Sequence, residues 1–225
     1  MTTQQEALWA GEFGRDYTKR NADPRVGSIQ ANAMLFDKIM RHTFGVKQVL
    51  EWGCGAGLNL AALRKHQPWL QLAGADVNKE AIAQAQKRLP EPKHTIINAS
   101  ILEGTEALGN HGVLPADLVL SKGLLIHIHP NDLERAYETL YQSTRRYILV
   151  CEYFSQDPVS IPYRGQPEAL WKRDFAGDLL DAYDDLQVVS YGFAWRRDPD
   201  PQDDLNWFLL EKTGPTYTPA IAGGG

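Results

Sequence analysis

Three glycines at alternate positions, Gly53, Gly55 and Gly57, constrain the fold of this chain more than any other feature. They lie within Val49–Leu60, where a short apolar run precedes them, a helix-like run follows, and Glu51 stands two residues before the first glycine. Glycine has no Cβ, so such a turn lets a ligand approach the backbone closely. The free N–H groups of the following helix point into the same space. The segment therefore predicts a strand, a ligand-binding turn and a helix.

A carboxylate, Asp76, closes the next strand-like run, Leu72–Asp76, nineteen residues after Gly57. An acid in that place suits the two hydroxyls of a ribose. Dinucleotide enzymes use a related turn, but their third glycine falls one residue later. The GxGxG spacing together with Asp76 resembles motif I and the ribose-binding acid of class I S-adenosylmethionine (SAM) methyltransferases. The resemblance implies SAM as the cofactor, either as methyl donor or as the sole substrate.

Composition indicates an ordinary soluble domain. The 225 residues are 43% apolar and 23% charged, with a net charge of −5, values typical of one α/β domain with a large core. No basic run exceeds two residues, which disfavours a nucleic-acid substrate. Two cysteines do not indicate a disulfide framework, and no apolar run is long enough for a signal sequence or a membrane span. We expect a cytoplasmic protein that acts on a small molecule, and the sequence leaves its oligomeric state open.

Strand-like runs alternate with helix-like runs, the pattern of a mainly parallel sheet covered on both faces. The expected fold class is α/β: a single Rossmann-like class I methyltransferase domain with an N-terminal helical lid. Its seven-stranded, mainly parallel sheet is expected to end in an antiparallel hairpin. We expect the lid in residues 1–24, the SAM-binding domain in residues 25–213 and a disordered tail in residues 214–225.

The elements are predicted from periodicity and from their boundary residues. The expected strands are Gln48–Glu51, Leu72–Asp76, His94–Asn98, Leu118–Lys122, Arg146–Phe154, Gln187–Trp195 and Leu205–Glu211. The expected helices are Arg25–Thr43, Leu58–His66, Lys79–Leu89 and Asp132–Ser143. Asn78 is predicted to cap the third of these helices, and Asn131 with Glu134 to form a capping box at the start of the fourth.

The ends of strands three and four are predicted to complete the cofactor site. Methyltransferases commonly hold an acid for the adenine amino group after strand three, where this chain has Asn98, Ala99 and Ser100. Ser100 or Asn98 must then serve instead. Leu125 is apolar enough to pack on the base, whereas Lys122 is either a cofactor contact or an ordinary polar group at a strand end. The full set of expected cofactor-binding residues is Glu51, Gly53, Gly55, Gly57, Asn59, Asp76, Val77, Ala99, Ser100, Lys122, Leu125, Tyr17, Arg20 and Trp9.

An aromatic stripe near the N-terminus repeats every four residues, at Trp9, Phe13 and Tyr17. This spacing places the three rings on one face of a helix. The stripe either packs against the core or closes over a sulfonium, whose positive charge aromatic faces attract. Arg15 and Arg20 on the same segment are candidates to pair with the carboxylate of the methionyl group.

Several segments carry a narrower resemblance, which covers nearly the whole chain to Lys212. They are Trp9–Gly14 with Tyr17 and Arg20, Lys122–Gly123 with Ile126–Ile128, Glu152–Tyr153, Ile161–Gly165, Lys172–Gly177 and Pro201–Asp204. These segments are similar to those of the pseudaminic acid biosynthesis-associated methylases. The same type of chain also resembles the azetidine-2-carboxylate synthases of peptide natural-product pathways.

The two families imply different reactions. Methyl transfer to oxygen or nitrogen of a small molecule, in specialised or sugar metabolism, needs an acceptor pocket and often a base. The azetidine synthases instead let the α-amino group of SAM attack its own Cγ, which gives the four-membered ring and methylthioadenosine. That reaction needs only a closed pocket that keeps water out and leaves the amine neutral. A non-catalytic SAM-binding protein is the third interpretation.

Candidate catalytic residues lie after strands four and five. The predicted set is Tyr153, Glu152, Tyr163 and His127. Asp174, Asp203 and Asp204 are further candidates for a base, and Arg164 is a candidate for closing the pocket. His127 forms an HxH pair with His129, but no third ligand has suitable spacing, so no metal site is expected.

Overall fold

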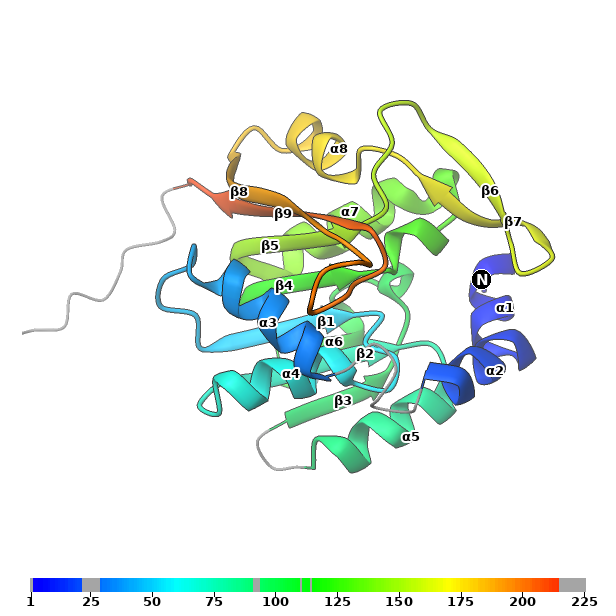
Figure 1. The fold of residues 1–225 in the computed structure, drawn as a ribbon, viewed down its shortest axis with the longest axis horizontal. Coiled ribbons are helices and arrows are strands. Elements are labelled where there is room, and N and C mark those ends of the chain that lie inside the picture. Colours follow the sequence, from blue (N-terminus) through cyan, green and yellow to red (C-terminus); the bar gives the residue numbers. More distant parts are fainter. Residues whose placement is uncertain (1, 22–28, 91–93, 110, 114, 215–225) are drawn as a thin grey trace, which may run out of the picture.

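Seven strands form one sheet in the order β3-β2-β1-β4-β5-β9-β8 (Figure 1). The computed structural model describes residues 2–21, 29–90, 94–109, 111–113 and 115–214. The first five strands run parallel, and β9 runs antiparallel to both of its neighbours. The strands are β1 Gln48–Trp52, β2 Gln71–Asp76, β3 His94–Asn98, β4 Ala116–Lys122, β5 Thr144–Glu152, β8 Leu186–Ala194 and β9 Leu205–Lys212.

Helices cover both faces of the sheet because successive residues of its central strands are apolar on both sides. In β1, Val49 belongs to the core under α3, α4 and α5, and Leu50 to the core under α7 and α8. Both side chains are almost fully buried. The helices are α1 Gln4–Ala10, α2 Glu12–Asn21, α3 Ile29–Met40, α4 Leu58–His66, α5 Lys79–Arg88, α6 Glu106–Gly109, α7 Leu133–Ser143 and α8 Phe175–Ala182, with 3-10 turns η1 Ile101–Glu103, η2 Leu125–His127 and η3 Pro130–Asp132. No helix in the described part of the chain is long and apolar enough to cross a membrane.

The predicted fold class is confirmed, including the antiparallel hairpin β8–β9 that ends the sheet. Residues 25–28 of the first predicted domain helix lie outside the described residues. The predicted capping box of Asn131 and Glu134 is wrong, because α7 starts at Leu133 without a side-chain cap. The preceding turn η3 is capped instead by His129, whose Nδ1 accepts a hydrogen bond from the backbone N–H of Asn131 at 3.2 Å.

A second, two-stranded sheet follows β5, and the sequence did not predict it. It pairs β6 Val159–Tyr163 with β7 Gln166–Lys172. Its turn residues Arg164 and Gly165 both have positive φ, 50° and 83°, the geometry of the tight turns that connect hairpin strands. In β6 the apolar residues do alternate, at Val159, Ile161 and Tyr163, but β7 begins with the exposed run Gln166–Glu168 and continues with a block of buried residues. The two segments together therefore lack the shared alternation by which a half-buried hairpin is recognised.

The hairpin and the N-terminal helices meet at one edge of the sheet. Figure 1 shows α1, α2 and β6–β7 beyond the carboxyl ends of the parallel strands. The rings of Phe13 from α2 and Tyr163 from β6 lie 6.2 Å apart, edge to face. In open α/β sheets this edge is where ligands bind, and here two separate segments cover it.

Asn78 connects the sheet edge to the N-terminal helices. Its Oδ1 accepts from the backbone N–H groups of Glu80 and Ala81, which caps α5 as predicted. Its Nδ2 donates to the carbonyl of Trp9 at 3.0 Å. A Cβ on Gly14 would collide with the same carbonyl. Glycine is therefore required at position 14 for α2 to lie this close to the end of α1. One buried amide thus holds both a helix of the domain and the end of α1.

Two substitutions at position 78 separate these roles. Asn78→Ala removes the cap and is expected to lower the free energy of unfolding by about 1–2 kcal/mol, measured by urea denaturation. Asn78→Asp keeps the cap, because a carboxylate is a good acceptor at a helix start, but it loses the donor to Trp9. We expect this variant to unfold near the wild-type midpoint while the amides of residues 4–10 exchange hydrogen faster. Equal exchange in the aspartate variant and the wild type would contradict the link.

Candidate active site

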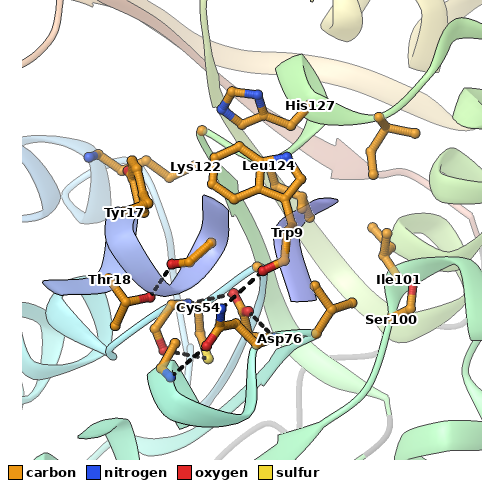
Figure 2. A pocket seen from close by; sticks show the side chains of 18 of the residues that line it. Trp9, Tyr17, Thr18, Cys54, Asp76, Ser100, Ile101, Lys122, Leu124 and His127 are labelled. Carbon is orange, nitrogen blue, oxygen red and sulfur yellow. Dashed lines mark hydrogen bonds between the residues drawn. The ribbon is translucent and has the colours of Figure 1, made fainter. Parts of the chain in front are cut away.

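A cavity of about 260 Å³ lies at this edge of the sheet. Figure 2 shows side chains from its walls, and they come from segments far apart in the sequence. The floor is formed by the turn after β1 and by the ends of β2 and β4. Helices α1 and α2 close one side, and residues 201–203 of the β8–β9 loop contribute to another.

The three glycines of the turn have different tasks. All have positive φ, 71° at Gly53, 50° at Gly55 and 75° at Gly57, a region that costs residues with a Cβ about 1–2 kcal/mol. A Cβ on Gly53 would lie 2.9 Å from the side chain of Leu124, and one on Gly57 would lie 3.1 Å from Cβ of Ala85. A Cβ on Gly55 would meet nothing within 4 Å. Gly55 therefore offers its backbone to the cavity, whereas Gly57 does not line it and serves helix packing.

Asp76 is fixed at the end of β2. Its Oδ2 accepts from the backbone N–H of Gly55 at 2.9 Å, and its Oδ1 accepts from that of Asn78 at 2.8 Å. Burial raises the pKa of this carboxyl, and the two hydrogen bonds act in the opposite direction. The side chain lines the cavity next to the glycine turn, and each carboxylate oxygen keeps a lone pair for a ligand hydroxyl.

Glu51 lies behind the turn and is fully buried. Its Oε1 accepts from Nδ2 of Asn59 at 2.6 Å, and its Oε2 has no hydrogen-bond partner among the described residues. Burial raises the pKa of Glu51 to about 8, although Asn59 and the ammonium of Lys122 favour its charged form. Asn59 and Lys122 both line the cavity. An unsatisfied buried carboxylate oxygen is costly, so this wall is suited to a ligand that brings a donor or a positive charge.

The wall after β3 is mainly apolar, with one hydroxyl. Ala99, Ser100, Ile101 and Leu102 line it. Ser100 caps η1, since its Oγ accepts from the N–H of Leu102 at 3.0 Å; its own O–H remains available as a donor. The Asn98 side chain is exposed, does not line the cavity, and donates to the backbone carbonyl of Asp76. Of the two alternatives at this strand end, only Ser100 is in place.

The aromatic stripe faces the cavity and continues into a larger cluster. The ring of Trp9 makes edge contacts with Phe13 and Tyr17, at centroid distances of 5.1 and 5.3 Å. It also lies 4.4 Å from the ring of His127, which is 5.3 Å from that of Tyr163. Burial raises the pKa of the Tyr17 hydroxyl, and the neighbouring Tyr163 adds to this effect. Helices α1 and α2 and hairpin β6–β7 thus meet through rings around His127.

His127 is neutral at physiological pH. Burial lowers its pKa to about 4. Its Nδ1 lies 2.6 Å from the carbonyl oxygen of Ala169 in β7, which fixes the proton on Nδ1 and leaves Nε2 as an acceptor. His127 and His129 both line the cavity. The Nδ1 of His127 is hydrogen-bonded to Ala169, and the Nδ1 of His129 accepts from the backbone N–H of Asn131. No group of three or more His, Cys, Asp or Glu side chains in the described residues is arranged to hold a metal ion.

Glu152 holds the turn that presents His127. Its carboxylate is buried at the end of β5 and accepts from Oγ of Ser121 at 2.7 Å. It also accepts from the backbone N–H groups of residues 124–126, at 3.0–3.5 Å. Burial raises the pKa of Glu152, and these hydrogen bonds oppose the shift. The group does not line the cavity, so this predicted catalytic residue fixes the start of η2 instead of facing a ligand.

The structure brings most of the predicted site residues together, and it places others outside the wall. The cavity is lined by Trp9, Tyr17, Gly53, Gly55, Asn59, Asp76, Val77, Ala99, Ser100, Lys122 and His127. Outside the wall lie Glu51, Gly57, Leu125, Arg20, Glu152, Tyr153 and Tyr163. Leu125 is fully buried in the core, and Leu124 lines the cavity in its place. Arg15 is paired with Glu80 at 3.8 Å on the surface.

Sequence reasoning did not propose some of the wall. Thr18, Asn32, Cys54, Leu124 and Ile101 line the cavity. Thr18 follows Tyr17 on the same helix, and Cys54 lies between two of the glycines, so adjacency to predicted residues would have found both. Asn32 is different, because α3 is brought to the cavity only by tertiary packing; its Oδ1 accepts from Nε2 of Gln202 in the β8–β9 loop.

Comparison with known proteins agrees with this arrangement. Residues 50–146, less than half of the chain, match the family described as a methyltransferase domain. The plantazolicin methyltransferase BpumL, solved with S-adenosylhomocysteine (SAH), superposes with a TM-score of 0.63 at 17% identity over 93% of this chain and 94% of its own. The fold is that of class I methyltransferases.

Two further methyltransferases have the same architecture. The 1,6-didemethyltoxoflavin-N1-methyltransferase of Burkholderia thailandensis has a TM-score of 0.69 at 16% identity, covering 95% of this chain and 91% of its own. The magnesium protoporphyrin IX methyltransferase of Synechocystis PCC 6803, solved with SAM, has a TM-score of 0.65 at 13% identity, covering 93% and 98%. No curated protein sequence matches the chain.

The buried neutral state of His127 predicts a pH dependence of stability. The folded pKa is near 4 and the unfolded one near its ordinary value, so the unfolded chain takes up a proton first as pH falls. The neutral ring therefore makes its full contribution to the free energy of unfolding above about pH 6.5. This contribution, about 3 kcal/mol, is lost as the pH falls from about 6.5 to 4. His127→Gln keeps a donor for Ala169 but does not titrate. Urea unfolding should therefore show a smaller loss in the variant over this interval; parallel curves would contradict the assignment.

Proposed function

We propose that the protein binds SAM in this cavity and transfers its methyl group to an oxygen or nitrogen atom of a small molecule. The observation that carries the proposal is the shared wall of Gly55 and Asp76, which faces an aromatic lid across one enclosed space. An open backbone and a fixed carboxylate suit the nucleoside, and aromatic faces suit a sulfonium.

The wall offers a place for each part of the cofactor. Asp76 would accept from the ribose hydroxyls, and the apolar strip with Ser100 would flank the adenine. Lys122 is the charged group placed for the methionyl carboxylate, since Arg15 and Arg20 lie outside the wall. The unpaired Oε2 of Glu51 lies behind this wall, next to Asn59, and its carboxyl would attract the methionyl amine. Val77 and Ala99 complete the nucleoside wall.

The chain's own residues would control the proton and the water. SAM supplies an electrophilic methyl carbon on its sulfonium. The nucleophile that takes this carbon must give up a proton, and Nε2 of His127 is the acceptor at hand, because Nδ1 is held by Ala169. Glu152 fixes the turn that carries His127. Trp9 and Tyr17 cover the cavity and exclude water.

A small acceptor agrees with the charge of the chain and with its structural neighbours. Two of these were solved with small molecules bound, 1,6-didemethyltoxoflavin in one and a desmethyl plantazolicin analogue in the other. The chain has a net charge of −5, which does not favour the basic surface that a nucleic-acid substrate requires. A place in the cytoplasm and the division into lid, domain and tail stay predictions from the sequence.

The cofactor assignment is tested by calorimetry with SAM and SAH on an Asp76 variant. Asp76→Ala is expected to weaken SAM binding by about 1–3 kcal/mol, the cost of leaving buried partners unmet. Asp117→Ala is the matched control. Asp117 also accepts from two backbone N–H groups, those of Lys47 and Gln48, but it lies at the opposite, amino end of β4. Unchanged SAM affinity in the Asp76 variant, or an equal loss in the control, would remove Asp76 from the ribose.

A second candidate is cyclisation of SAM, and the size of the cavity favours it. About 260 Å³ is below the range of roughly 300–1,000 Å³ that ligand pockets usually span. A cavity of that size has little room for an acceptor beside the cofactor. In this reaction the neutral α-amino nitrogen attacks Cγ of the same molecule and the Cγ–S bond breaks. Methylthioadenosine leaves with the sulfur electron pair, and one amine proton passes to a base.

Incubation with SAM alone separates the two reactions. Methyl transfer requires a second substrate, so the methyltransferase is expected to leave SAM intact without an acceptor. The cyclase would form methylthioadenosine and azetidine-2-carboxylate with no partner. Chromatography of the nucleosides against an enzyme-free control reads the outcome. Saturable methylthioadenosine formation well above spontaneous breakdown would overturn methyl transfer and establish cyclisation.

A further inference from the structure

The edge strand β8 is long, uncharged and aromatic. Its nine residues, Leu186–Ala194, contain no charged residue and no proline. Within the described residues it pairs only with β9, so its outer edge presents backbone N–H and C=O groups. Soluble proteins protect such edges with lysine, proline, short strands or a covering element, because a bare edge recruits another strand. β8 has one irregularity, between Val188 and Ser190, and none of the other devices is found in the described part of the chain.

Apolar side chains line one face of this edge. Tyr191 is 71% exposed and Phe193 51%, and they stand at alternate positions of β8, which point to the same side of a strand; Trp195, 46% exposed, follows directly after the strand. The ring of Tyr191 stacks on Phe208 of β9 at 6.1 Å, and Phe208 also contacts Phe154 beyond β5 at 6.2 Å. Val188 is exposed as well and pairs with Leu210, a residue of the core on this same side of the sheet. These residues form a continuous aromatic patch at the rim of the sheet.

The charges beside β8 are arranged for pairing with itself. Asp184 stands two residues before the strand, and Arg197 three residues after it; both are exposed. Arg196 already pairs with Asp204, whereas Arg197 lies over the ring of Trp195. Asp184 and Arg197 lie in the turns that flank the strand. Antiparallel pairing of two copies therefore brings the Asp184 end of each strand next to the Arg197 end of the other.

We propose that β8 is a dimer interface, where two copies of this chain join edge to edge into one continuous sheet. An antiparallel strand pair between identical copies is isologous and closes with two-fold symmetry, so it satisfies both edges at once. Backbone hydrogen bonds supply the pairing, and the aromatic patch and the opposite charges of Asp184 and Arg197 at the two strand ends favour the antiparallel arrangement. The inference does not depend on the proposed function.

The test is the mass of the full-length protein in solution, measured by sedimentation and light scattering over a wide range of concentration. We expect the wild type to be a dimer that dissociates on dilution. Tyr191→Lys and Phe193→Lys are each expected to weaken dimerisation at least about tenfold, the effect of losing a buried aromatic anchor. Trp69→Lys is the matched control, since Trp69 is 66% exposed but lies just before β2. It should leave the dimer unchanged.

Charge reversal tests whether the two strands pair antiparallel. Asp184 and Arg197 are exposed, so we expect their substitution to leave the fold unchanged. Arg197→Asp should weaken the dimer, and the double variant Asp184→Arg/Arg197→Asp should restore it, because the pairs form again with exchanged signs. Circular dichroism and the thermal midpoint check that each variant folds. A wild type that stays monomeric at every concentration overturns the proposal and leaves the patch to a different partner. A dimer that survives both lysine variants and the single charge reversal overturns it as well.

Discussion

The site depends on one backbone constraint, the left-handed turn between β1 and α4. Gly53 and Gly57 adopt this left-handed backbone where they pack against Leu124 and Ala85, and a Cβ at either position would crowd these neighbours. Gly55 adopts the same backbone conformation but faces the cavity, where a Cβ would meet no protein atom within 4 Å. The turn positions the N–H that Asp76 accepts and brings α4, with Asn59, over Glu51. Substitution at the two packing glycines would disturb the fold, and substitution at the third would fill the cavity.

Buried carboxylates organise the rest of the site, and each does so by accepting backbone N–H groups. Asp76 fixes the glycine turn and the start of α5, and Glu152 fixes the turn that leads to His127. A buried charge is tolerated only when such bonds satisfy it. Glu51 is the exception: it accepts from the side chain of Asn59 and not from a backbone N–H, and its other oxygen is unpaired among the described residues. Asp76 and Glu152 thus fix backbone turns, whereas Glu51, a chemically similar group, has an oxygen that no such bond uses.

Local signals were sufficient for the sheet and for the wall of the cavity formed by the glycine turn and Asp76. The glycine spacing, Asp76 and the Asn78 cap depend on residues near in sequence, so a pattern predicts them well. The roles that failed depend on packing between distant segments. Leu124 and Leu125 differ by one position, and only the geometry of η2 decides which enters the core. Glu152 looked like a base because its four partners lie about thirty residues away. Hairpin β6–β7 was missed because only β6 alternates, whereas β7 begins with the exposed run Gln166–Glu168.

The bond from Asn78 to the carbonyl of Trp9 has a kinetic consequence. Asn78 is adjacent to the nucleoside wall, and its backbone N–H is already held by Asp76. A ligand that orders Asp76 therefore also orders the residue that holds α1 in place. Residues of α1 line the cavity, so a ligand that orders Asp76 would also hold this helix in place. Movement of the N-terminal helices would then affect the release rate separately from the equilibrium affinity.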